Sequence, residues 1–167
     1  PCRYLKEKGY SEIEIRVDEK GHLREEELES ALQNSPALVS LMWANNETGV
    51  LFPISRLAPR IKSAGGYVHT DAVQAVGKVP VDVSRVPVDF LTLSGHKLHA
   101  PKGIGALYIR RGTPFSPLIM GGHQERNRRS GTENVPGIVA LGKACELARV
   151  RMGEESRRMA ALRDRLE

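Results

Sequence analysis

A lysine follows the end of a predicted β-strand in the second half of this 167-residue chain. The apolar run from Asp89 to Leu93 leads into the turn Ser94-Gly95-His96-Lys97, so a hydroxyl and an imidazole accompany the amine. Ligands of open α/β sheets bind at the carboxyl ends of the strands. An amine that is partly desolvated there loses proton affinity and can form a Schiff base with a carbonyl compound. A surface lysine in a polar loop is the simpler alternative, and this motif alone does not decide between them.

Two further polar clusters also follow predicted strands. Asn45-Asn46 comes after the apolar run 37–42, and Asp71 with Gln74 comes after the next predicted strand. Because the carboxyl ends of parallel strands share one edge of a sheet, these clusters and the lysine can converge. Pyridoxal phosphate requires such a set, since an amine binds its aldehyde and a carboxylate keeps its ring nitrogen protonated. Taken singly, Asp71 is more simply a helix cap and Asn46 a turn residue.

The elements that must position these groups alternate between strands and helices. Strands are predicted over 13–17, 37–42, 67–70, 89–93 and 104–109, and helices over 25–34, 55–64, 137–149 and from about 154 to the end. This order predicts an α/β fold with a mainly parallel sheet and flanking helices. The continuous apolar run 37–42 predicts a strand buried on both faces. Helical periodicity predicts that Met159, Leu162 and Leu166 face inward.

Composition narrows the class of function. The chain is 40% hydrophobic and 27% charged, which is ordinary for a globular protein, and no apolar run approaches the roughly 20 residues that span a bilayer. The net charge of +5 permits a polyanion partner, but no aromatic residues interleave with Arg126, Arg128 and Arg129. We therefore expect neither a nucleic-acid nor a membrane partner. Cys2 and Cys145 form no CxxC pair, which fits the reducing cytoplasm.

Two other kinds of site are weakly indicated. His96 and His99 are spaced to face one way as metal ligands, but no third ligand follows at suitable spacing, so we expect no metal. Gly103-Ile104-Gly105 begins like a dinucleotide-binding fingerprint. Tyr108 stands where the third glycine belongs, and a strand follows instead of a helix, so this interpretation fails.

Four ordered motifs resemble the signatures of cysteine desulfurases. They are Asn45-Asn46-Glu47-Thr48-Gly49, the segment 69–78 (HTDAVQAVGK), Ser94-Gly95-His96-Lys97 with 101–105 (PKGIG), and 129–134 (RSGTEN). The resemblance covers about residues 18–148 and is greatest to the NifS-like branch, which is associated with nitrogen fixation and iron–sulfur cluster assembly. These are class V, fold-type I pyridoxal-phosphate enzymes. The resemblance implies that residues 1–150 are the central part of the cofactor-binding large domain, and that 151–167 begin a helix leading to a C-terminal small domain.

The resemblance implies a role for each matching residue around the cofactor ring. Lys97 is the implied Schiff-base lysine and the proton shuttle at the substrate α-carbon, with His96 as its catalytic neighbour. Asp71 would pair with the pyridine nitrogen, and Gln74 would hydrogen-bond to the phenolate oxygen. Asn46 would contact the substrate carboxylate beside the ring.

The remaining implied roles concern the cofactor phosphate. Ser94 and His96 would bind the phosphate of pyridoxal 5'-phosphate in their own subunit. Thr132 would reach the phosphate held by the other subunit of a homodimer. The polar loop 121–132 would thereby serve the neighbouring site.

The family reaction converts L-cysteine to L-alanine and leaves the sulfur as a persulfide on an enzyme cysteine, for transfer to an iron–sulfur scaffold or another acceptor protein. Neither Cys2 nor Cys145 matches the persulfide position. We expect the chain to be a central fragment of a longer protein, because it begins at Pro1 and ends within a charged helical pattern. We expect this fragment alone to be inactive. The alternatives are a selenocysteine lyase or another class V aminotransferase and, among non-enzymes, a truncated fold or interaction fragment.

Overall fold

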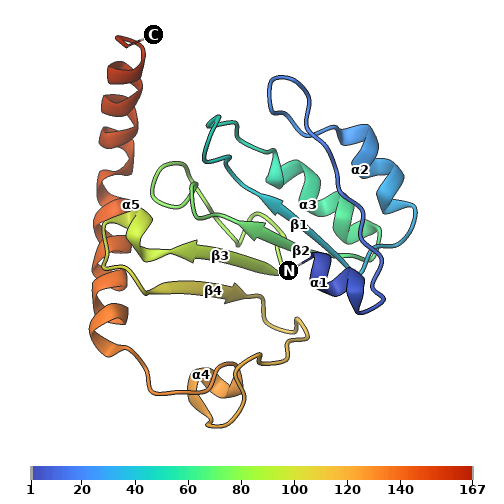
Figure 1. Cartoon of the computed structure of the whole chain (residues 1–167). Coiled ribbons are helices and arrows are strands. Elements are labelled where there is room, and N and C mark those ends of the chain that lie inside the picture. Colours follow the sequence, from blue (N-terminus) through green and yellow to red (C-terminus); the bar gives the residue numbers. More distant parts are fainter. Residues whose placement is uncertain (1, 167) are drawn as a thin grey trace.

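Four strands form one sheet in a computed structural model that describes residues 2–166. In spatial order they are β1 (Leu38–Met42), β2 (Tyr67–Asp71), β3 (Phe90–Ser94) and β4 (Gly105–Ile109). The first three are parallel, and β4 runs antiparallel to β3 (Figure 1). The predicted α/β fold with a mainly parallel sheet is therefore confirmed.

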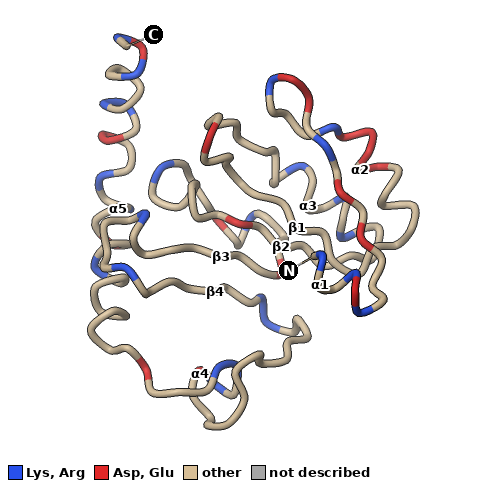
Figure 2. Tube along the Cα trace, in the orientation of Figure 1, with Lys and Arg blue, Asp and Glu red and all other residues tan. Residues whose placement is uncertain are grey.

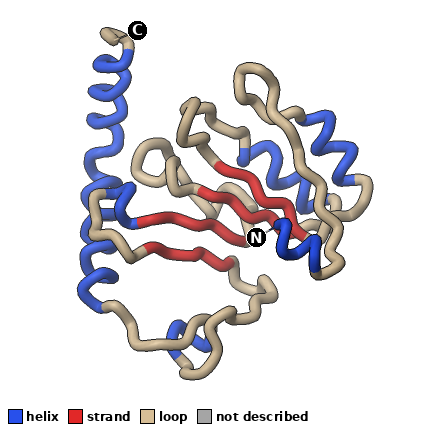
Figure 3. Tube along the Cα trace, viewed as in Figure 1, coloured by secondary structure: helices blue, strands red, loops and turns tan. Residues whose placement is uncertain are grey.

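Helices flank the sheet on one face and at one edge (Figure 3). They are α1 (Cys2–Glu7), α2 (Glu25–Leu32), α3 (Ile54–Ser63), α4 (Gln124–Asn127), α5 (Val135–Arg163) and the 3₁₀ helix η1 (Gly95–Leu98). The apolar face of α3 packs on β2, and α5 packs on η1. Figure 1 shows α5 passing the end of β3 and continuing well beyond the sheet.

The hydrophobic core fills the space between the sheet and α3. Successive strand residues point to opposite faces, and Leu41, Val68 and Leu91 all point to the buried face. From α3, Leu57 and Ile61 meet them and are completely buried. The opposite face carries Ser40, His69, Asp71 and Thr92, so polar groups gather on the side that α3 leaves uncovered.

One buried hydroxyl lies within this core. Thr70 is completely buried between Leu41 and Leu91, and its Oγ1 has no hydrogen-bond partner among the residues that the structure describes. A buried hydroxyl without a partner costs free energy that an apolar group of the same shape does not. We expect Thr70→Val to stabilise the fold by about 1 kcal/mol. Thermal unfolding should show a melting temperature about 2–4 °C higher, and a lower value would contradict this account.

Three expectations from the sequence are wrong. Residues 13–17 form no strand, because the Arg16 backbone and guanidinium bind the carboxylate of Glu27 in α2, and Val17 makes only a single bridge with Leu23. The strand predicted to be buried on both faces is the outer strand β1, in which Leu38 is 53% exposed.

The third error concerns the end of the chain. The two helices predicted there form one uninterrupted helix, α5. Met159, Leu162 and Leu166 are exposed and do not face inward. The physical reason is visible in Figure 1, where the last part of α5 and the turn after it extend past the sheet, with no other described helix or strand against them.

Candidate active site

Strands β2 and β3 bring the predicted carboxylate and the predicted lysine turn to one edge of the sheet. Asp71 is the last residue of β2 and lies in register with Thr92 of β3. Ser94 ends β3 two residues further along and on the same face. With a rise of about 3.3 Å per residue and about 4.8 Å between strands, the backbones of Asp71 and Ser94 lie roughly 8 Å apart. This spacing is suitable for a small planar ligand held from both sides.

The lysine is presented by the turn that follows β3. Gly95 begins η1, and its N–H donates to the carbonyl oxygen of Ile104 at 2.9 Å. A Cβ on Gly95 would lie 2.9 Å from that same oxygen, so only glycine allows the chain to turn this closely. Lys97 and His96 are exposed on η1. The hydroxyl of Ser94 and the Nδ1 of His96 are 2.7 Å apart, so these two groups are held together beside the amine.

Asp71 directs the chain into a compact turn. Its Oδ1 accepts a hydrogen bond from the N–H of Val73 at 2.9 Å, while the residue as a whole remains exposed. Among the described residues no helix begins directly after Asp71, so it is not the helix cap considered from the sequence, and its carboxylate instead closes a local turn. This contact uses one carboxylate oxygen and leaves the side chain at the edge beside β3.

The turn after Asp71 brings a second lysine into the site. The ammonium of Lys78 donates to the side-chain Oε1 of Gln74 at 2.9 Å and to the Gln74 carbonyl oxygen at 3.3 Å. Burial lowers the pKa of Lys78, and the nearby charge of Lys97 lowers it further. Lys78 was not predicted as a site residue, although its spacing of four residues from Gln74 is typical of side chains that meet on a helical turn.

Helix α5 packs against the turn that contains Gln74 and Lys78 and against the turn that carries Lys97. Gly77 has a φ of +78°, and a Cβ there would lie 2.5 Å from Cδ2 of Leu98 in η1 and 3.1 Å from Cβ of Ala148 in α5. The hydroxyl of Ser156 donates to the Lys78 carbonyl oxygen at 2.8 Å. The helix therefore fixes the Gln74–Lys78 turn and the Lys97 turn relative to each other.

On the face of the sheet that α3 leaves uncovered, the side chain of His69 in β2 contacts residues of both neighbouring strands. The Nδ1 of His69 lies 2.7 Å from the Ser40 hydroxyl, and its Nε2 lies 3.4 Å from the Thr92 hydroxyl. Burial lowers the pKa of His69, while the negative charge of Asp71 partly opposes this change. His69 was also missed by sequence reasoning, although a histidine two residues before Asp71 must share its face of a strand.

The lowered pKa of His69 predicts a pH dependence of folding. Between its ordinary value of 6.5 and its lower folded value, the unfolded chain binds a proton that the folded chain does not. The contribution of neutral His69 to stability should be complete above pH 6.5 and should be lost as the pH falls below it, by at most about 1.4 kcal/mol per pH unit. Urea unfolding at several pH values should show this slope, and His69→Asn should reduce it. An unchanged slope in that variant would contradict the assignment.

Asn46 and Thr132 do not join these contacts. Asn46 lies in the exposed turn after β1, near the same edge, and its amide donates to Glu47 at 2.7 Å. Thr132 is exposed in the segment between α4 and α5, which lies beyond β4 and away from the ends of β2 and β3 (Figure 1). In the chain from residue 2 to 166, no three His, Cys, Asp or Glu side chains gather as metal ligands.

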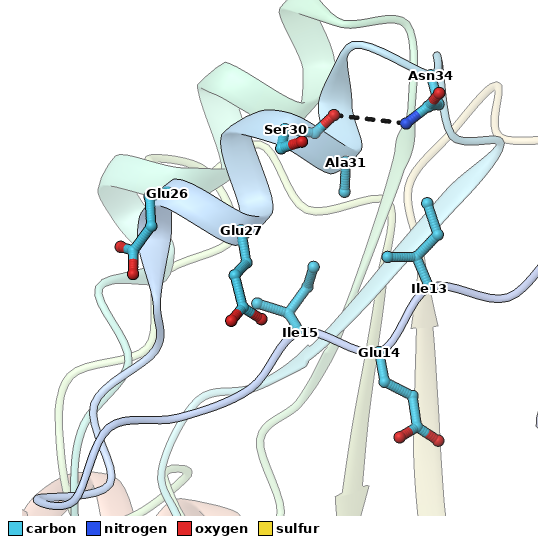
Figure 4. A pocket seen from close by; sticks show the side chains of 8 residues that line it. All are labelled: Ile13, Glu14, Ile15, Glu26, Glu27, Ser30, Ala31 and Asn34. Atoms are coloured by element: carbon cyan, nitrogen blue, oxygen red, sulfur yellow. Dashed lines mark hydrogen bonds between the residues drawn. The ribbon is translucent and has the colours of Figure 1, made fainter.

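A groove elsewhere on the molecule is separate from this edge. It has a volume of about 350 Å³ and lies between the extended segment 13–15 and α2 (Figure 4). Its lining includes Glu14, Glu26 and Glu27, and Figure 2 shows acidic residues gathered over this part of the molecule. Glu27 is bound to Arg16, and no amine, imidazole or thiol lines the groove. The groove therefore has no side chain that could form a Schiff base with a carbonyl compound.

One protein family and several cysteine desulfurases match this chain over nearly its whole length. The model of the aminotransferase class-V family matches residues 1–167. Cysteine desulfurase 2 of Trichormus variabilis is 60% identical over 166 residues, which are 99% of this chain and 42% of that protein. Cysteine desulfurase NifS of Azotobacter vinelandii is 55% identical over 166 residues, covering 99% of this chain and 41% of that protein.

Solved structures share the fold described above. A structure titled "NIFS-LIKE PROTEIN" superimposes with a TM-score of 0.95 and 43% identity, over 98% of this chain and 46% of that one. An apo cysteine desulfurase from Thermococcus onnurineus superimposes with a TM-score of 0.89 and 26% identity, over 98% of this chain and 45% of that one. The chain spans less than half the length of the relatives that it matches.

Proposed function

Because this chain belongs to the aminotransferase class-V family, we propose that it is the lysine-bearing part of a NifS-like cysteine desulfurase. The proposed enzyme converts L-cysteine to L-alanine and passes the sulfur through an enzyme persulfide to an iron–sulfur scaffold or another acceptor. One observation supports this above all others. Asp71 and the turn that carries Lys97 end neighbouring parallel strands, so a carboxylate and an amine face the same edge of the sheet.

The groups at this edge fit pyridoxal 5'-phosphate, which the family implies. Asp71 and Lys97 are both exposed there, and the paired Ser94 and His96 offer donors for a phosphate. When bound, pyridoxal phosphate supplies an aldehyde that condenses with a lysine amine and a ring that stores an electron pair.

Each residue contributes a separate task in this proposal. Lys97 holds the cofactor and moves the proton at the substrate α-carbon, with His96 beside it. Asp71 keeps a proton on the ring nitrogen, because a carboxylate next to that nitrogen favours its charged form. The amide of Gln74 donates to the phenolate oxygen.

The remaining residues bind the phosphate of the cofactor and the carboxylate of the substrate. Ser94 and His96 bind the phosphate, and Asn46 contacts the substrate carboxylate. Thr132 reaches the phosphate of the other subunit in a homodimer. The segment between α4 and α5, which contains Thr132, lies beyond β4 and away from the ends of β2 and β3, and this supports a role toward another subunit (Figure 1).

We further propose that the persulfide cysteine lies outside this chain. Burial raises the pKa of the Cys145 thiol, which disfavours the thiolate that sulfur chemistry requires. Cys2 is exposed on α1, the first helix of the chain, and does not match the persulfide position of the family. Residues 1–150 would belong to the large domain, and 151–167 would begin the connection to the small domain. We place the enzyme in the cytoplasm. Separately, none of the helices described between residues 2 and 166 has the length and hydrophobicity of a membrane span.

Product analysis tests this function. The protein expressed from its natural gene, with pyridoxal phosphate, should release alanine from L-cysteine, whereas the 167-residue chain alone should not. Alanine formation only from L-selenocysteine would favour a selenocysteine lyase. Transamination of L-cysteine without sulfur release would favour an aminotransferase. Either outcome would overturn the desulfurase proposal.

A further inference from the structure

We propose that Lys78 is a positioning residue that fixes which end of the Gln74 amide faces the bound cofactor. This inference rests on the proposed function, in which the Gln74 amide donates to the phenolate oxygen of pyridoxal phosphate. Its basis is a contact that the motifs do not reveal. The ammonium of Lys78 lies 2.9 Å from Gln74 Oε1 and 3.3 Å from the Gln74 carbonyl oxygen.

The chemistry of the two groups permits only one orientation. A glutamine amide has an oxygen that accepts and a nitrogen that donates, and the two ends are nearly identical in shape. A lysine ammonium has three donors and no acceptor. Lys78 therefore selects the oxygen, and the amide nitrogen must point away from Lys78. In that orientation it presents N–H donors to an anionic acceptor such as a phenolate.

Lys78 is itself held firmly enough to impose this choice. Its N–H donates to the carbonyl oxygen of Ala75 at 3.0 Å, and its own carbonyl oxygen accepts from the Ser156 hydroxyl of α5. The preceding Gly77 is in close contact with Leu98 of η1 and Ala148 of α5. The backbone of Lys78 is thus fixed by the same helix that supports the Lys97 turn.

The position of the ammonium also connects it with the site. Lys78 lies near enough to Lys97 for that charge to lower the pKa of Lys78, in addition to the effect of burial. The contact between Lys78 and Gln74 is therefore made at the edge where the cofactor is proposed to bind.

Cofactor affinity in a double-mutant cycle tests the inference. The protein from the natural gene would be titrated with pyridoxal phosphate as wild type, Lys78→Met, Lys78→Arg, Gln74→Leu and the double variant Lys78→Met with Gln74→Leu. Lys78→Met removes the donors at similar length, so the amide can flip, and we expect affinity to fall about threefold to tenfold, as for loss of one hydrogen bond. Lys78→Arg keeps a donor and should remain within about twofold of wild type.

The cycle separates positioning from a general effect on folding. Lys78→Met should have no further effect in the Gln74→Leu background, because no amide remains to be oriented. The absorbance band of the bound cofactor should shift in Lys78→Met and remain unchanged in Lys78→Arg. Lys143→Met is the matched control, since Lys143 is exposed on α5 and pairs with Glu146, and it should behave as wild type.

The failures of the two proposals are distinguishable. Wild-type protein that binds no pyridoxal phosphate would overturn the proposed function and this inference together. Wild-type binding with an equal loss in Lys78→Met whether or not Gln74 is present would overturn the inference alone. The same is true if Lys78→Met binds as tightly as wild type.

Discussion

Alanine formation from L-cysteine is expected to fall at least about a thousandfold when Lys97 is replaced with alanine. In the proposed mechanism, the variant loses both the amine that would hold the cofactor aldehyde and the base that would move the α-proton. Lys78 is an amine, but its donors are directed to Gln74. The melting temperature should change little, because Lys97 is exposed and contributes no side chain to the core.

The measurement should be made on the protein from the natural gene, with alanine quantified after incubation with L-cysteine. Reduction with borohydride followed by mass spectrometry should label Lys97 in the wild type and leave the Lys97→Ala variant unlabelled. Lys20→Ala is a suitable control, since Lys20 is exposed in a turn near the start of the chain and should leave activity intact. More than a tenth of wild-type activity in Lys97→Ala, or labelling of a different lysine, would be incompatible with the proposed role.

Sequence patterns were sufficient to predict that Asp71 and the turn that carries Lys97 lie at the same edge of the sheet. The predicted strands 67–70 and 89–93 are short, and each is followed directly by a polar residue, Asp71 or Ser94. Because parallel strands present their carboxyl ends at one edge, the proximity of these two segments follows from topology alone. No long-range side-chain contact had to be known in advance.

The residues that sequence reasoning missed depend on geometry that periodicity does not contain. His69 meets Ser40 only because β1 and β2 pair in one particular register. Lys78 meets Gln74 because the turn between them is compact and α5 supports it. Alternation along 13–17 likewise indicates an extended segment, but cannot show whether a neighbouring strand exists to pair with it.

Replacing Asp89 with asparagine is expected to produce the largest loss of stability, about 3 kcal/mol. Asp89 is only 3% exposed, and both of its oxygens accept from the ammonium of Lys62, at 2.9 and 2.8 Å. One of them also accepts from the N–H of Val68 at 2.7 Å. The amide would remove the negative charge and place N–H donors against the donors of Lys62 or Val68, which breaks the ion pair with Lys62.

Thermal unfolding should show a melting temperature lower by about 6–12 °C for Asp89→Asn, on the scale of about 2–4 °C per kcal/mol. Adding Lys62→Met should restore part of the loss, because the unpaired ammonium is then removed as well. A shift of less than about 2 °C would show that the ion pair contributes little. Asp89 stands just before β3, at the opposite end of that strand from Ser94 and Lys97. Below the transition, cofactor affinity should therefore be unchanged, since this ion pair lies at the start of β3 and the proposed cofactor site lies at the other end of that strand.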